Sequence, residues 1–350
     1  MEKVTRTFID LVKIDSPSGE EDGVRKYLIM KLSSLGIKSV TDKVGNLFVK
    51  VDGAGEPVLL SAHMDTVEPG RGIIPKVVNG VVKSDGSTIL GADNKAAVAA
   101  ILTVLGNLPD SHRSLEIVFS VCEETDGGIE SFDFNQLKSK IGIAPDRGSK
   151  IGNVVLAAPW IDNFEIEVHG RIVHSSVPEK GINALTAASR AMVALEWGRP
   201  DKETTTNMGI IHGGSVMNSI PSKVDLTGEV RSFSEKSLEK NIVKIRDTFE
   251  KEAKKIGAKI AFRRESYCKG YSYKKTDYSV VYFKKVCDRL KIPLSYEKSF
   301  GGSDANSFIA HGISVLNIGE GSKYPHTLRE QVSEKDLFKL VELIATYITL

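Results

Sequence analysis

The amino-acid sequence predicts an α/β fold, in which a mainly parallel sheet covered by helices is interrupted by a smaller α+β domain. Apolar strand-like segments alternate with helical segments along residues 1–162 and again along 271–350, as in a parallel sheet with helices on both faces. Between them, residues 163–270 follow the order β-α-β-β-α-β of a ferredoxin-like unit. The length of 350 residues exceeds what one core usually supports, which also favours two domains.

The first part of the chain supplies helices, a hairpin and buried strands. Residues 2–36 are expected to be helical with polar breaks, because apolar residues recur there every three to four positions. Ala96–Leu108 is rich in small residues and predicts a helix packed closely on a sheet, and Asn79-Gly80 predicts a hairpin turn within 76–83. Strands are expected at 39–41, 46–51, 57–62, 115–122 and 141–144.

The central segment alternates polar and apolar residues, which is typical of strands with one buried face. Its strands are expected at 163–169, 207–212, 223–231 and 259–263, and its helices at 183–195 and 235–255. The chain then returns to the alternation of helices and apolar strands seen in residues 1–162, with helices at 280–290 and 335–350 and a strand at 314–318. The simplest interpretation is a domain inserted into an α/β domain.

Composition excludes several classes of protein. A net charge of +2 gives no electrostatic reason to expect a nucleic-acid partner, and no apolar run approaches the ~20 residues of a membrane span. The N-terminal residues lack the basic-then-apolar layout of a signal peptide. Three scattered cysteines argue against a disulfide framework and fit a reducing compartment, so a cytoplasmic location is expected.

Five short segments carry histidines and acids at the predicted ends of strands or starts of helices. In Leu59–Thr66, His63 and Asp65 stand two residues apart, so in an extended chain both point to the same side. A ligand histidine often has such an acid on its other ring nitrogen. The remaining candidates are Asp93 at a helix start, Glu123-Glu124 after a buried strand, Asp146 after another strand, and His326 in a loop.

Taken singly, most of these residues have a structural explanation. Asp93 could be a helix N-cap, Glu123-Glu124 a solvated strand end, Asp146 a turn residue and His326 a surface histidine. Taken together, two histidines and several carboxylates form the ligand set of a two-metal site suited to zinc, cobalt or manganese. One carboxylate would bridge the ions, and another would move the proton of an activated water.

These residues, in this order, resemble the co-catalytic di-zinc exopeptidase family of peptidase T, aminoacylase and the glutamate carboxypeptidases. The similarity covers nearly the whole chain and is greatest to the peptidase T-like branch. The segments that carry it are Gly91-Ala92-Asp93-Asn94-Lys95-Ala96, Cys122-Glu123-Glu124, Asn207-Met208-Gly209, Gly213-Gly214, Asn218-Ser219-Ile220-Pro221, Arg231-Ser232 and Gly301-Gly302-Ser303-Asp304-Ala305-Asn306.

The resemblance implies two divalent ions, zinc before cobalt or manganese, and a role for each matching residue. It implies one ion on His63, Asp93 and Asp146, and the other on Asp93, Glu124 and His326, with Asp93 bridging. Glu123 would be the general base and Asp65 would orient His63. In the inserted lid and dimerisation domain, 163–270, His174 would reach the site of a partner subunit. Asn218 and Arg231 would bind a carboxylate or carbonyl of the substrate.

The sequence departs from the family pattern in three places. Around His174 it reads Val-His-Ser-Ser, where the family usually has Ala-His-Ala-Gly or Ala-His-Pro-Gly. After His326 it continues Thr-Leu-Arg-Glu, where the family often carries an acid-rich segment. Asn94 follows Asp93 where an aspartate is common in peptidase T. The first departure leaves the local turn and the fit of the substrate open. The family holds the peptide bond after the bridging aspartate in the cis form, and we expect the same for Asp93–Asn94.

The predicted function is a metal-dependent hydrolase of short peptides, in which Glu123 activates a metal-bound hydroxide to cleave an amide bond near the chain end. The expected form is a tripeptide aminopeptidase-like homodimer. An N-acyl amino acid deacylase or a carboxypeptidase of the same family would use the same ligands and stays open. A metal-dependent peptide-binding protein without catalysis is the alternative from another class.

Overall fold

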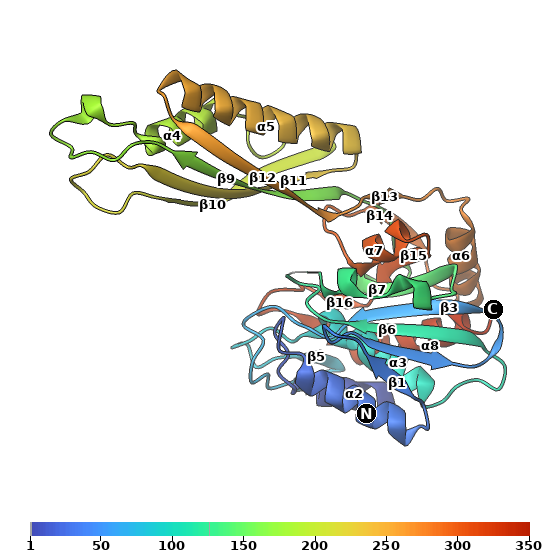
Figure 1. Ribbon diagram of the computed structural model, residues 1–350. Helices are drawn as coiled ribbons and strands as arrows, with labels where there is room; N and C mark the ends of the chain where they lie inside the picture. The colour runs from blue at the N-terminus through green and yellow to red at the C-terminus, as the bar shows by residue number, and fades with distance from the viewer. Residues whose placement is uncertain (1, 126) are drawn as a thin grey trace. The chain divides into compact units, whose positions relative to one another are not determined.

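The computed structural model describes residues 2–125 and 127–350, and the chain divides into two compact units. The first unit contains the chain up to Leu156, Ser272–Lys298 and Ser303–Leu350, and the second contains Ala157–Tyr271 and Ser299–Gly302. The elements of each unit can be followed by colour in Figure 1. The predicted α/β class with an inserted α+β domain is confirmed.

The first unit is built on a nine-stranded sheet with the order β1-β2-β6-β3-β7-β15-β8-β13, in which β14 also pairs with β8. Its centre, β6-β3-β7-β15, is parallel, whereas β1 and β2 are antiparallel additions at one side. The sheet is therefore mixed, with its parallel strands in the middle. The strands are β1 (Ser39–Thr41), β2 (Leu47–Val51), β3 (Ala54–His63), β6 (Arg113–Ser120), β7 (Ile141–Arg147), β8 (Asn153–Ala158), β13 (Tyr271–Ser272), β14 (Ser295–Lys298) and β15 (Ser314–Gly319).

Helices cover both faces of this sheet. On one face α1, α3 and α8 pack side by side, and on the other α7 packs on β7 and β15. Successive residues of β3 point to opposite faces of the sheet. Leu60 packs in the large core with α1, α3 and α8, and Leu59 packs in the smaller core with α7. The helices of this unit are α1 (Lys3–Val12), α2 (Asp22–Ser34), α3 (Ala92–Leu105), α6 (Tyr278–Leu290), α7 (Asp304–Ala310) and α8 (Glu334–Tyr347).

Helix α3 begins earlier than its small-residue pattern indicated. It starts at Ala92 after Gly91, which has the left-handed φ of 71°, and its first turn is irregular at Asp93 and Asn94. From Lys95 onward every residue of the helix is buried, as expected for an alanine-rich helix that approaches a sheet closely. The irregular turn sets the position of Asp93.

A small four-stranded sheet with the order β16-β17-β5-β4 joins distant parts of the first unit. The hairpin β4 (Lys76–Val78) and β5 (Val81–Lys83) pairs with β17 (Gln331–Ser333), which pairs with β16 (Ser322–Lys323). The loop between β16 and β17 carries His326, so this sheet anchors both ends of that loop.

The second unit is an antiparallel sheet of order β10-β11-β9-β12 with two helices on one face. Figure 1 shows helices α4 and α5 beside the strands of this sheet. Inward residues such as Ile166 on β9 and Leu226 on β11 form one core with these helices. Strand β10 lies at an edge of the sheet. The elements are β9 (Trp160–His169), α4 (Ala184–Ala194), β10 (Thr204–Gly213), β11 (Lys223–Ser232), α5 (Glu235–Lys255) and β12 (Lys259–Cys268), which is the predicted β-α-β-β-α-β order.

No helix in the described part of the chain combines the length and apolar composition that crossing a membrane requires.

Candidate metal centre

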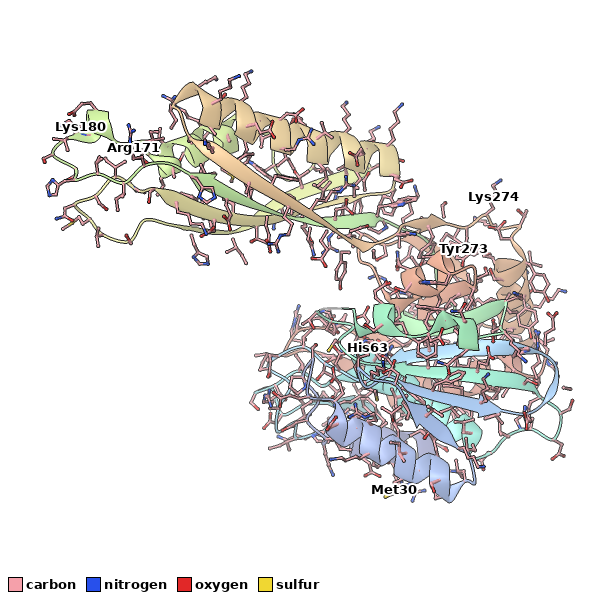
Figure 2. The ribbon with its side chains drawn as sticks, in the orientation of Figure 1. Met30, His63, Arg171, Lys180, Tyr273 and Lys274 are labelled. Carbon is pink, nitrogen blue, oxygen red and sulfur yellow. The ribbon has the colours of Figure 1, made fainter. Side chains whose placement is uncertain are left out.

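Histidines and acids from separate segments meet where the central strands of the first unit end. His63 is the last residue of β3, as Figure 2 shows, and it lies in register with Ser120 at the end of β6. Asp146 lies near the end of β7, the neighbour of β3 on its other side. Because these strands are parallel, their carboxyl ends share one edge of the sheet.

The first group of converging ligand atoms is centred on His63, whose side chain is 1% exposed. Its Nε2 lies 3.2 Å from Asp93 Oδ1 and 3.2 Å from Asp146 Oδ1. One ligand atom from each of the three residues falls within 4.8 Å of the others. Spacing of this kind leaves room for a single ion held by all three.

The second group is centred on His326, which is about half exposed. Its Nε2 lies 2.9 Å from Glu124 Oε1 and 3.4 Å from Asp93 Oδ2. Asp93 thus faces His63 with one carboxylate oxygen and His326 with the other. The two groups share this one carboxylate, which is the arrangement of a bridging ligand.

Glu123 stands beside the first group. Its Oε2 is 4.0 Å from His63 Nε2, farther than the oxygens of Asp93 and Asp146. His63, Glu123 and Glu124 also form a set of atoms within 4.8 Å of one another. The distances therefore place Glu123 at the centre, but they do not say which residue of the Glu123-Glu124 pair binds metal and which acts as the base.

Asp65 holds two parts of the centre together and is completely buried. His63 Nδ1 lies 3.0 Å from the main-chain oxygen of Asp65 and 3.3 Å from its Oδ1. The carboxylate also accepts hydrogen bonds from the N–H groups of Glu123 and Glu124, both at 3.1 Å, and from Ser18 Oγ at 2.6 Å. It is thus placed to orient His63 and to fix the turn that carries the two glutamates.

The charges of the centre call for cations. Burial and the negative charge of Asp146 raise the pKa of Glu123 well above its usual value. Burial also raises the pKa of Asp146 to about 6, against the opposing effect of His63. Burial would lower the pKa of His63, but its carboxylate partners, Asp146 first, raise it well above 6.5. Excess buried carboxylate relative to histidine, with nitrogen and oxygen donors only, suits divalent ions of borderline hardness.

Glu330 supports the centre, a role that its sequence context does not predict. Its carboxylate is 1% exposed and accepts hydrogen bonds from the N–H groups of Leu90, Gly91 and Asp93, at 2.8, 2.7 and 3.0 Å. It therefore ties the His326 loop to the irregular turn that presents Asp93. Its sequence signal was weak, since an acid four residues after a candidate ligand histidine is common on surfaces.

Asn94, one of the three departures from the family pattern, also contributes to the centre. Its Nδ2 donates to Asp146 Oδ1 at 3.0 Å, so it orients a candidate ligand. The peptide bond between Asp93 and Asn94 is cis, which confirms the expectation from the sequence.

The three remaining predicted residues lie in the second unit, and the fold separates them into two places. The N–H of Ser175 donates to the main-chain oxygen of Asn218 at 3.0 Å, so His174 and Asn218 are neighbours. Arg231 lies eight residues beyond Lys223, at the far end of β11, roughly 26 Å along an extended strand. There it pairs with both carboxylate oxygens of Glu229, at 2.9 and 2.8 Å, and donates to the main-chain oxygen of Phe300.

Comparisons with known proteins find relatives over the whole chain. The M20 peptidase dimerisation domain matches residues 161–257. The uncharacterised protein YqjE of Bacillus subtilis is 34% identical over 99% of this chain and 97% of its own length. The crystal structure of aminopeptidase PepT from Bacillus cereus has a TM-score of 0.90 and 31% identity, covering 99% of this chain and 97% of that one. A tripeptidase from Staphylococcus aureus has a TM-score of 0.93 and 29% identity, with the same coverage.

Proposed function

This chain belongs to the M20 peptidase family, in its peptidase T-like branch, and on that basis we propose that it is a tripeptide aminopeptidase. As a metal-dependent hydrolase, it would cleave the amide bond next to the free amino end of a short peptide. The observation that carries the proposal is the pair of three-residue groups that share the two oxygens of Asp93.

We assign His63, Asp93 and Asp146 to one divalent ion and Asp93, Glu124 and His326 to the other. Zinc is the ion we propose, because two imidazoles with carboxylates match its preference; cobalt and manganese accept the same donors. When bound, the two ions polarise the carbonyl of the substrate and lower the pKa of a water molecule. The protein's own residues then have to orient the ligands and move the proton.

We assign the transfer of the proton to Glu123. Its side chain lies beside His63 but outside the two groups that share Asp93. The burial that raises the pKa of Glu123 makes its carboxylate a stronger base, so it can take a proton from water and return it to the leaving amine. The hydrogen bond from its N–H to Asp65 holds the residue in place during both transfers.

The separation within the second unit supports a homodimer. A tripeptide spans at most about 11 Å, whereas Asn218 precedes the start of β11 and Arg231 lies roughly 26 Å along that strand from Lys223, so one tripeptide is too short to bridge the two residues of one chain. If both residues bind substrate, they serve different sites. We therefore assign His174 and Asn218 to the site of a partner subunit, where His174 would stabilise the oxyanion and Asn218 a substrate carbonyl, and Arg231 to a substrate carboxylate.

The edge strand β10 is the surface we propose for that dimer. Its Ile210 and Ile211 are each more than half exposed, and Met217 in the following loop is fully exposed. A ten-residue edge strand with exposed apolar side chains offers unpaired N–H and C=O groups on which the strand of a second chain can add. We propose a cytoplasmic location, in keeping with three free cysteines.

A substrate panel tests the proposed function. The chain, loaded separately with zinc, cobalt and manganese, would be given free tripeptides, N-blocked tripeptides, dipeptides and N-acyl amino acids. Hydrolysis that requires a free amino terminus supports the aminopeptidase, whereas cleavage of N-acyl amino acids would show a deacylase. A loaded chain that binds peptides but cleaves none of them would identify a binding protein instead.

A further inference from the structure

Three successive backbone N–H groups at the end of β6 all point to carboxylates. Those of Glu123 and Glu124 donate to the two oxygens of Asp65. The preceding one, from Cys122, donates to Glu21 Oε1 at 3.0 Å. Consecutive N–H groups of this kind form a concavity that binds an anion, and here two side chains of the protein fill it.

Glu21 is poorly explained as a part of the neighbouring helix. It stands at the N-cap of α2, but its side chain makes no capping hydrogen bond there. The carboxylate turns instead toward the end of β6 and is 4% exposed. A buried carboxylate needs donors, and one oxygen of Glu21 collects three of them, from Gly19 N–H at 2.8 Å and from both the N–H and the thiol of Cys122.

The residue that Glu21 holds has an unusual backbone. Cys122 has a φ of 54°, in the left-handed region that non-glycine residues seldom adopt. It directly precedes Glu123 and Glu124, so the direction of the chain at Cys122 determines where both glutamates point. A carboxylate that binds its N–H therefore fixes the start of the turn, as Asp65 fixes the two residues that follow.

We propose that Glu21 is a positioning residue for the Glu123-Glu124 pair and acts through Cys122. This inference rests on the proposed function, since it assigns the base and one ligand to that pair. The role depends on an oxygen acceptor at the place of Oε1 rather than on negative charge, because all three donors are uncharged.

Two substitutions separate acceptor position from charge. Glu21→Gln keeps an oxygen at the same reach and removes the charge, whereas Glu21→Asp keeps the charge and withdraws the oxygen by one methylene. Glu20 offers a matched control in the same loop, because its exposed side chain pairs with Arg71 on the surface. We expect Glu21→Asp and Glu21→Ala to lower kcat on the order of 10- to 100-fold with little change in KM. Glu21→Gln should stay within about threefold and Glu20→Ala within about twofold.

A second measurement does not depend on turnover. With cobalt bound, the visible absorption bands of the enzyme report the ligand geometry around Glu124. The bands should shift in Glu21→Asp and stay unchanged in Glu21→Gln and Glu20→Ala. An aspartate variant with unaltered kcat and spectrum, or a glutamine variant as impaired as the aspartate one, would overturn the proposal. If the unchanged chain hydrolyses no peptide, the proposed function fails, and the cobalt spectra still decide the role of Glu21.

Discussion

Replacing Glu123 with glutamine tests the division of labour within the glutamate pair. Glutamine has nearly the same size and keeps the N–H that donates to Asp65 at 3.1 Å. It cannot accept a proton from water as a carboxylate does. Both three-residue groups that share Asp93 stay intact, so each chain should still bind two ions.

The magnitude follows from the role assigned to the side chain. General base catalysis contributes on the order of 10²- to 10⁴-fold, which raises the activation free energy by about 2.7 to 5.4 kcal/mol when it is lost. The fold should not suffer, because the raised pKa of Glu123 shows that its charged form is disfavoured in the metal-free protein. Thermal melting of the metal-free variant is therefore expected at or above that of the unchanged chain.

The assay combines steady-state hydrolysis of a tripeptide with metal analysis of the same sample. Glu124→Gln is the matched control, since it removes the negative charge of the carboxylate whose Oε1 lies 2.9 Å from His326 Nε2. That variant should lose one of the two ions, whereas Glu123→Gln should lose turnover alone. Activity within about threefold of normal would refute Glu123 as the base. Joint loss of metal and activity would place Glu123 among the ligands.

Three further predictions follow from the same geometry. Asp65→Ala leaves the N–H groups of Glu123 and Glu124 without their acceptor. At about 1 to 3 kcal/mol for each unpaired N–H, the free energy of unfolding of the metal-free chain, measured in urea, should fall by about 2 to 6 kcal/mol. A decrease below about 1 kcal/mol would contradict this role of Asp65. Hydrogen bonds to Asp93 and Glu124 raise the pKa of His326 to about 10, so its protonated form stabilises the metal-free chain fully below pH 6.5 and loses that effect toward pH 10. Metal uptake at pH 7 should therefore release protons and tighten as the pH rises, and a calorimetric enthalpy that is the same in phosphate and Tris buffers would count against it. Equal amounts of His174→Ala and Glu123→Gln subunits should together recover about a quarter of normal activity, because about half of the dimers are mixed and each mixed dimer has one of its two sites intact. No recovery would disprove the exchange of His174 between subunits.

The sequence was most informative where chemistry and periodicity coincide. His63 and Asp146 lie at the ends of apolar strands and the glutamate pair follows another, and the carboxyl ends of parallel strands must meet at one edge. The helix 235–255 was predicted with its observed ends from its charged amphipathic pattern, and in the structure the side chain of Ser234 caps it. Strands β8 and β14 and helix α7 were missed, because β14 and α7 have only four and seven residues and the apolar residues of β8 do not alternate with polar ones.

The supporting residues could not be predicted in the same way. Glu21, Glu330 and the second role of Asp65 all depend on carboxylates that bind backbone N–H groups of distant loops. Backbone donors leave no trace in residue identity, so the sequence shows an acid but not its partner. The separation of Arg231 from Asn218 was likewise hidden, because it depends on the length and path of β11.

The strand order of the first unit has a consequence for folding during synthesis on the ribosome. Strand β15 lies between β7 and β8 in the sheet, although the whole second unit separates it from them in sequence. The second unit is almost continuous, so it can fold once residue 271 has emerged, while the sheet of the first unit waits for residues 314–319. During that interval the apolar sides of β7 and β8 are exposed, and we expect nascent chains arrested between these points to bind chaperones that recognise unpaired strands.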